Sequence, residues 1–274
     1  MTDDMLEDQV RYRCDAGIAW ITLNRPEAGN ALTWGQRERI IALLDSASGD
    51  LAVRAVVIGA QGRHFCTGAD LRADRPAPVL PEGAPERPAG SVARMIAAGA
   101  QRLIAAVLDC EKPVIAAVGG TAAGIGAHLA FAADLVVASE QAKFIEVFVR
   151  RGIIPDGGGA YLLARLVGLH VAKELVFFGD DLSAADALRL GLVNKVVAPD
   201  ELDETVRAWA ERLAAGPTVA LGLAKRLLNR STESDRLTAF AEEAAGQELA
   251  TNSADAQEGV ASFVERRPTQ FKGW

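Results

Sequence analysis

The chain has 274 residues, of which 50% are hydrophobic and 24% are charged, so it can bury a full hydrophobic core in one main domain. Its formal net charge of −7 disfavours the phosphate backbone of nucleic acids as a partner. Three widely spaced cysteines, Cys14, Cys66 and Cys110, indicate neither a disulfide framework nor a metal site. No apolar run reaches the length of a signal sequence or a membrane span, so we expect a cytoplasmic protein without a membrane partner.

The chain alternates short apolar strands with helices. We expect strands at residues 10–14 and 18–23, joined by a tight turn at Asp15-Ala16-Gly17, and then a helix that begins after the N-cap Thr33 and ends near Gly49. In chain order, further strands are expected at residues 55–58, 113–118, 135–138, 143–146 and 193–197, and helices at 92–108, 125–132, 160–167, 184–190, 202–215, 219–229, 237–249 and 254–265. The alternation predicts an α/β fold with parallel crossovers.

Residues 72–90 interrupt this alternation. They contain five prolines, Pro76, Pro78, Pro81, Pro85 and Pro88, so they form neither a regular helix nor a central strand. We expect a long loop, and its place directly after a glycine-rich turn makes it a candidate cover for an active site.

Two glycine-flanked segments carry the main chemical signal. They read FCTGADL at residues 65–71 and GGTAAGIGAHLA at residues 119–130. Each offers a backbone N–H at a turn that glycine permits, and two such donors converging on one oxygen would stabilise an enolate or a tetrahedral oxyanion. The pattern therefore indicates chemistry on a carbonyl group such as a thioester.

These segments stand in order with several other motifs: LNRP at 23–26, NAL at 30–32, KPVIAAV at 112–118, GIIPDGG at 152–158 and GLVN at 191–194. Together they resemble the enoyl-CoA hydratase/isomerase family, the crotonase superfamily. The resemblance implies a crotonase-like spiral of ββα repeats in residues 1–198 and a helical C-terminal trimerisation region in residues 199–274. It also implies an acyl-CoA thioester as partner, no cofactor apart from the coenzyme A of the substrate, and a homotrimer or a dimer of trimers.

The resemblance also implies roles for single residues. The backbone N–H groups of Ala69 and Ile125 correspond to the two oxyanion donors. His128 and Phe148 occupy the places of the two glutamates that handle water in hydratases of the family, and Phe148 cannot transfer a proton. Asp156 lies where some isomerases of the family keep a working aspartate. Burial in an acyl pocket would raise the pKa of such a carboxyl and suit it to proton transfer between C2 and C4 of an enoyl thioester.

The same residues have structural alternatives. Asp156 precedes a glycine run and a helix, so it could be only an N-cap. His128 lies on an apolar helix face, so it is either a packed core residue or a second acid or base. Glu146, at the end of a predicted strand, could be a displaced acid, although exposure at the surface is the expected reading.

For binding of coenzyme A and the acyl chain, the resemblance implies one group of residues within a subunit and a second group from the last helix of a neighbouring subunit. The first group comprises Arg25, Ala28, Asp70, Leu71 and Phe148, and the second comprises Phe263 and Arg266.

The leading hypothesis is double-bond isomerisation through a thioester enolate, with Asp156 and His128 as catalytic residues. The alternatives are hydration or another lyase or hydrolase reaction that uses His128 and Asp156, and a non-catalytic acyl-CoA binding protein. A dinucleotide-binding oxidoreductase is disfavoured because the glycines of residues 119–126 do not match G-x-G-x-x-G. The acyl group is left open.

Overall fold

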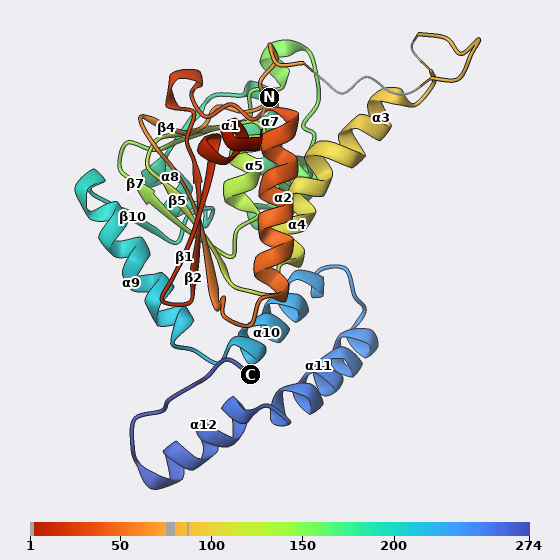
Figure 1. Ribbon diagram of the computed structural model, residues 1–274. Helices are drawn as coiled ribbons and strands as arrows, with labels where there is room; N and C mark the ends of the chain where they lie inside the picture. The colour runs from red at the N-terminus through yellow and green to blue at the C-terminus, as the bar shows by residue number, and fades with distance from the viewer. Residues whose placement is uncertain (1–2, 75–79, 87) are drawn as a thin grey trace.

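Two β-sheets form the centre of the protein, whose computed structural model describes residues 3–74, 80–86 and 88–274 (Figure 1). The larger sheet has six strands in the order β1-β2-β3-β5-β7-β10, and the smaller has four in the order β4-β6-β8-β9. The strands of the larger sheet are β1 Val10–Asp15, β2 Ile18–Leu23, β3 Ala55–Ala60, β5 Val114–Val118, β7 Leu135–Ser139 and β10 Lys195–Val197. Those of the smaller sheet are β4 His64–Cys66, β6 Thr121–Ala123, β8 Lys143–Ile145 and β9 Asp181–Ser183.

The first two strands form the predicted hairpin. β1 and β2 pair antiparallel, with Asp15 opposite Ile18. The two turn residues, Ala16 and Gly17, have φ angles of 49° and 77°. Positive φ at both turn positions matches the twist of the flanking strands, which explains why the short turn closes here. All other pairs of the larger sheet are parallel, as the alternating pattern predicts.

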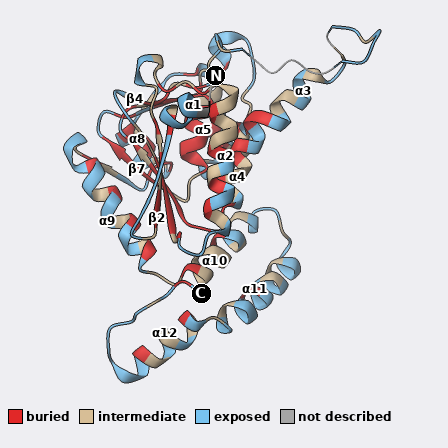
Figure 2. Cartoon of the chain, viewed as in Figure 1, coloured by how far each residue is buried: buried red, intermediate tan, exposed pale blue. Residues whose placement is uncertain are grey.

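Helices cover both faces of the larger sheet, so its central strands are buried on both sides (Figure 2). On β3, Val56 and Ile58 belong to the main core, whereas Ala55 and Val57 face a second cluster under α9 Leu202–Ala214. The main core lies under α2 Trp34–Gly49, α4 Arg102–Asp109 and α5 Ile125–Phe131. The predicted helix after Thr33 is confirmed, and Thr33 closes a capping box with Gln36.

The smaller sheet is built from a repeated unit of the chain. In each repeat, a strand of the larger sheet is followed directly by a strand of the smaller one: β3 by β4, β5 by β6 and β7 by β8. The strands β4, β6 and β8 pair in parallel. Helix α5 follows β6, and α6 Gly159–Leu166 follows β8, which makes the ββα repeats visible. The prediction missed β4, β6 and β9, since three residues are too few for a clear pattern. It also missed the helices α1 Asp3–Gln9 and α7 Gly168–Phe178.

The predicted helix at 92–108 is one helical stretch with a π-helical turn in its middle: α3 Ser91–Ile96, η2 Ala97–Gln101 and α4. Among the described residues it is the one stretch, Ser91–Asp109, whose length and mean hydropathy of 1.3 would allow it to cross a membrane, whereas the sequence analysis expected none. Helices in protein cores pass the same test, and α4 buries three apolar side chains against α2 and its neighbours. Of the preceding loop, residues 75–79 and 87, with Pro76 and Pro78, lie outside the described residues; the described remainder has no helix or strand.

The C-terminal helices α10 Thr218–Arg230, α11 Arg236–Thr251 and α12 Ala254–Glu265 extend away from the sheets (Figure 1). The remaining elements are α8 Ala184–Arg189, η1 Pro26–Ala28, η3 Val149–Arg151 and η4 Pro199–Glu201. Lys225 anchors α10, because its Nζ lies 2.8 Å from Asp134 Oδ2 and 2.9 Å from the carbonyl oxygen of Val107. Helix α9 packs on the sheet, while the domain boundary at 198/199 stays a prediction.

Candidate active site

The first glycine-flanked segment turns sharply after β4. Gly68 has a φ of 110°, which favours glycine. The carbonyl oxygen of Gly68 accepts from Leu32 N at 2.8 Å, and Asp70 N donates to the carbonyl oxygen of Leu32 at 3.0 Å. The Gly68 carbonyl and the Ala69 N–H belong to one trans peptide and point in opposite directions. The Ala69 N–H therefore points away from Leu32.

The second segment leads into α5 through Gly124, which has a φ of 53°. Gly124 is the N-cap residue of the helix, and no side-chain hydrogen bond caps the helix there. Gly124 N donates to the carbonyl oxygen of Ile145 at 2.9 Å, so the turn is tied to the end of β8. Ile125 is the first residue of the helix. The N–H groups of a first helical turn have no partner four residues earlier, which leaves the Ile125 N–H able to bind an oxygen.

Two close approaches bring these turns together. A Cβ on Gly126 would lie 2.2 Å from the carbonyl oxygen of Cys66, so only glycine lets α5 lie against β4. A Cβ on Gly68 would lie 3.1 Å from the carbonyl oxygen of Ala123. The two candidate donors, Ala69 and Ile125, thus follow the carboxyl ends of neighbouring parallel strands, β4 and β6. Their role as an oxyanion hole stays a prediction.

The structure contradicts the expectation that Glu146 is exposed. Its side chain is 4% exposed, and that of His128 is fully buried, with Glu146 Oε2 lying 3.1 Å from His128 Nε2. The sequence held a signal for this: Glu146 is two residues after the buried Phe144, so it points to the same face of the strand. His128 is therefore hydrogen-bonded in the core, beside the second turn.

Phe148 and Gly159 enclose the imidazole of His128. The Phe148 ring stacks on it, with the ring centroids 5.3 Å apart and the planes at 11°. A Cβ on Gly159 would lie 2.2 Å from His128 Nε2, so the first residue of α6 has to be glycine for the ring to fit. His128 Nδ1 and Glu146 Oε1 are buried and have no hydrogen-bond partner in the part of the chain that the structure describes. A partly satisfied buried pair is costly, which points to a functional reason for keeping it.

Asp156 lies in the segment between η3 and α6, and its side chain is half-buried. The alternative that it caps this helix is wrong, because the N-cap of α6 is Gly158 and no side chain caps the helix. Burial raises the pKa of the Asp156 carboxyl, while the nearby charges of His128 and Arg37 lower it and that of Glu146 raises it. Arg37, on α2, is a neighbour that the sequence analysis missed. Asp156 and His128 are thus close enough to interact electrostatically.

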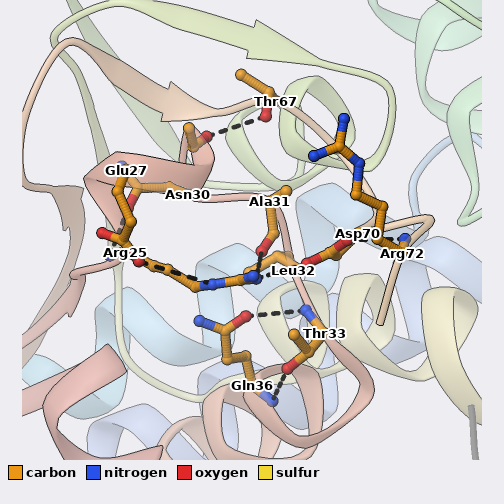
Figure 3. A network of polar contacts seen from close by, with 12 residues as sticks. Arg25, Glu27, Asn30, Ala31, Leu32, Thr33, Gln36, Thr67, Asp70 and Arg72 are labelled. Carbon is orange, nitrogen blue, oxygen red and sulfur yellow. Dashed lines mark hydrogen bonds and ion pairs between the residues drawn. The ribbon is translucent and has the colours of Figure 1, made fainter. Parts of the chain in front are cut away.

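The residues expected to hold coenzyme A fall into two places. Arg25 and Asp70 form an ion pair in which Arg25 Nη1 lies 2.7 Å from Asp70 Oδ2 (Figure 3). The hydrogen bond from Arg25 holds the pKa of the Asp70 carboxyl below its usual range. Ala28 ends η1 of the same turn, and Leu71, next to Asp70, is exposed. This cluster adjoins the Ala69 turn, so a ligand on the Leu71 side could reach the candidate oxyanion donors.

Phe263 and Arg266 are not brought to this cluster. Both are exposed at the end of α12, which lies at the other end of the molecule from β4 (Figure 1). A role from a neighbouring subunit stays a prediction for both. Among the described residues, no group of three or more His, Cys, Asp or Glu side chains could hold a metal ion.

Known proteins resemble this chain over most of its length. The family model described as enoyl-CoA hydratase/isomerase matches residues 13–274. A 1,2-epoxyphenylacetyl-CoA isomerase of Escherichia coli is 37% identical over 94% of this chain and 96% of its own. A short-chain-enoyl-CoA hydratase of Clostridium acetobutylicum is 36% identical over 91% of this chain and 92% of its own.

The solved structures agree as well. The crystal structure of an enoyl-CoA hydratase/isomerase from Cupriavidus metallidurans has a TM-score of 0.87 and 34% identity, and covers 97% of each chain. Its fold is the crotonase fold expected from the sequence motifs. A family match across nearly the whole chain, together with the same fold, shows that the chain belongs to the enoyl-CoA hydratase/isomerase family.

Proposed function

We propose that this protein moves a carbon–carbon double bond within an enoyl-CoA thioester, with Asp156 as the proton carrier. The observation that carries the proposal is the state of Asp156. It is half-buried, it does not cap its helix, and burial raises the pKa of its carboxyl. A carboxyl whose pKa is raised toward neutrality is a better proton carrier in both directions than an ordinary aspartate.

The reaction needs one carboxylate and one oxyanion site. Ionised Asp156 takes a proton from C2 of a 3-enoyl thioester, and the electron pair moves onto the thioester oxygen as a dienolate. The N–H groups of Ala69 and Ile125 stabilise this oxygen. Asp156 then returns the same proton to C4, the double bond forms between C2 and C3, and the carboxylate is regenerated. No atom is gained or lost.

The surroundings of Asp156 support isomerisation over hydration. The other acids and bases near the second turn, His128 and Glu146, are bonded to each other and sealed from solvent. Phe148, next to them, carries no group that could activate water. Hydration is the second candidate, because His128 Nδ1 and Glu146 Oε1 have no hydrogen-bond partner among the described residues and each could bind a water molecule.

We infer that the coenzyme A part of the substrate lies along Arg25, Ala28, Asp70 and Leu71, next to the Ala69 turn. The exposed apolar side chains of the C-terminal helices support assembly into a homotrimer or a dimer of trimers. They are Leu237, Phe240 and Leu249 on α11, and Val260, Phe263 and Val264 on α12. Such an assembly would bring Phe263 and Arg266 to a neighbour.

The test is turnover of a 3-enoyl-CoA, with the 2-enoyl-CoA product followed by chromatography. We expect Asp156→Ala to lower kcat by about 10²- to 10⁴-fold, the usual contribution of a general acid or base. Asp200→Ala is the matched control, since Asp200 is exposed in η4. Formation of a 3-hydroxyacyl-CoA from a 2-enoyl-CoA, without isomerisation, would favour hydration. Tight binding of acyl-CoA with no turnover of either substrate would make the protein a binding protein.

A further inference from the structure

Glu146 and His128 form a buried pair that takes no direct part in the proposed proton transfer. Neither side chain is open to solvent, and a single hydrogen bond of 3.1 Å joins Glu146 Oε2 to His128 Nε2. The pair adjoins the second turn, because His128 lies on α5 three residues after Ile125.

The 3.1 Å contact lets either atom carry the shared proton, depending on the tautomer of His128. A buried carboxylate is stable only when an opposite charge compensates it, and among the described residues the imidazole is the bonded partner of Glu146. An ionised Glu146 therefore requires a cationic His128 at this site.

The surrounding residues hold the ring in place. Phe148 stacks on one face, and Gly159 leaves no room for the ring to move toward α6. Because Gly159 is three residues after Asp156 and its N–H donates to the Asp156 carbonyl oxygen at 3.1 Å, the ring is also fixed relative to the Asp156 loop.

We propose that Glu146 is a positioning residue: it keeps His128 cationic and oriented beside the Asp156 loop, and His128 thereby sets how readily Asp156 gives up its proton. This inference rests on the proposed isomerase function for the role of Asp156. The hydrogen bond between Glu146 and His128 does not depend on that function.

Other charged groups near the pair are few. Arg37 on α2 acts on Asp156 in the same direction as His128. Cys66 on β4 is a neutral thiol, because burial raises its pKa to about 12. On the helices packed against α5, Arg102 of α4 is paired with Glu38, and Arg165 of α6 lies over its neighbour Tyr161.

The direction in which the pKa of Asp156 should change follows from the relative size of the effects of His128 and Glu146 on it. His128 lowers the pKa of Asp156 more than Glu146 raises it. Without the Glu146 carboxylate, a buried imidazolium loses its counter-charge and gives up its second proton. Asp156 then loses both influences, of which the lowering one is larger, so its pKa rises.

The first measurement is 15N NMR of histidine-labelled full-length protein without substrate, with the His128 signals assigned by their loss in His128→Asn. At pH 7 we expect both ring nitrogens of His128 to be protonated in the wild type, and one of them in Glu146→Gln. Glu140→Gln, an exposed glutamate in the turn after β7, should leave the signals unchanged. A neutral His128 in the wild type, or the same signals in Glu146→Gln, would overturn the ion pair.

The second measurement is the pH profile of isomerisation. We expect Glu146→Gln to lower kcat about 10- to 100-fold with KM little changed, the range seen when a partner that orients a histidine is removed. The acid limb of the profile should move to higher pH. A lower kcat with an unmoved acid limb would mean a purely structural role.

Glu146→Asp covers the case in which Glu146→Gln does not fold. It keeps the charge on a shorter side chain, so it should keep His128 cationic and restore most of the rate. An unmoved acid limb in Glu146→Gln, or a folded Glu146→Asp that loses both the rate and the cationic His128 signals, would overturn the positioning role. Absence of isomerisation in the wild type would defeat the proposed function, while the NMR result would still decide on the ion pair.

Discussion

The partly buried Asp134 and the buried Glu146 each have one basic side-chain partner, Lys225 and His128, and the two pairs differ in whether their polar atoms are satisfied. Lys225 Nζ contacts three oxygens: Asp134 Oδ2 at 2.8 Å and the carbonyl oxygens of Val107 and Lys112 at 2.9 and 3.3 Å. Asp134 Oδ2 also accepts from Val114 N at 2.7 Å. This complete pair ties α10 to the sheet.

The Glu146–His128 pair has one hydrogen bond, and two of its buried atoms have no partner. An unsatisfied buried polar atom costs about 1–3 kcal/mol, so a pair kept for stability alone would be completed or replaced by apolar residues. The comparison teaches that a complete buried pair serves the fold, whereas an incomplete pair beside a candidate active site points to chemistry. Three experiments test this distinction.

The largest effect is expected at the complete pair. Lys225→Ala removes the buried ammonium group and leaves the partly buried Asp134 without its counter-charge. The loss of unfolding free energy should approach, as its upper limit, the cost of breaking a fully buried pair, about 3–5 kcal/mol. Urea unfolding measures the loss. The control is Lys173→Ala, an exposed lysine of α7, whose change should stay within about 0.5 kcal/mol.

A second substitution sharpens this result. Lys225→Met removes the ammonium group and leaves the charge of Asp134 in place. Adding Asp134→Asn removes the carboxylate charge as well, so the double variant should be more stable than Lys225→Met alone. Equal stability of the single and double variants would show that packing, not charge, makes Lys225 important.

A smaller effect is expected from filling the space behind His128. Gly159→Ala places a methyl group against the imidazole, and overpacking of this kind costs about 1–3 kcal/mol. Because the ring must move, isomerisation should slow as well. In Gly49→Ala the added methyl group meets nothing within 4 Å, so that control should gain about 0.5–1 kcal/mol. A fully active Gly159→Ala enzyme would argue against a fixed His128.

The smallest effect concerns stability and pH at Asp156. A folded-state pKa raised above that of the unfolded chain means that the folded protein binds the proton more tightly. The contribution of Asp156 to stability is therefore greatest at low pH, and it declines as pH rises from its ordinary value of 3.8 through the raised pKa. Asp156→Asn should remove this decline, giving a higher Tm than the wild type at pH 7 by thermal unfolding. A variant that is less stable at every pH would contradict the raised pKa.

Much of the larger sheet could be predicted because its signals are local. The hairpin turn needs residues that accept positive φ, and Ala16-Gly17 supplies them within two positions. Thr33 and Gln36 close a capping box within one helical turn. The three-residue strands β4, β6 and β9 were missed because pairing with neighbours, not their own pattern, makes them strands.

The candidate site was predicted in part for the same reason. The turns at Gly68 and Gly124 are readable because they demand glycine locally. Glu146 was misplaced, since its burial depends on His128, 18 residues earlier, and on α6 packing from the other side. The capping role for Asp156 was wrong because Gly158 is the N-cap of α6 and no side chain caps the helix.

The sequence by itself determined the family, the α/β alternation and the two backbone turns, since each depends on residues close together in the chain. Only the tertiary structure decided which titratable groups meet. Hydrogen bonds and desolvation act over a few ångströms in space, and those distances between α5, the end of β8 and the Asp156 loop arise only when the ββα repeats pack together.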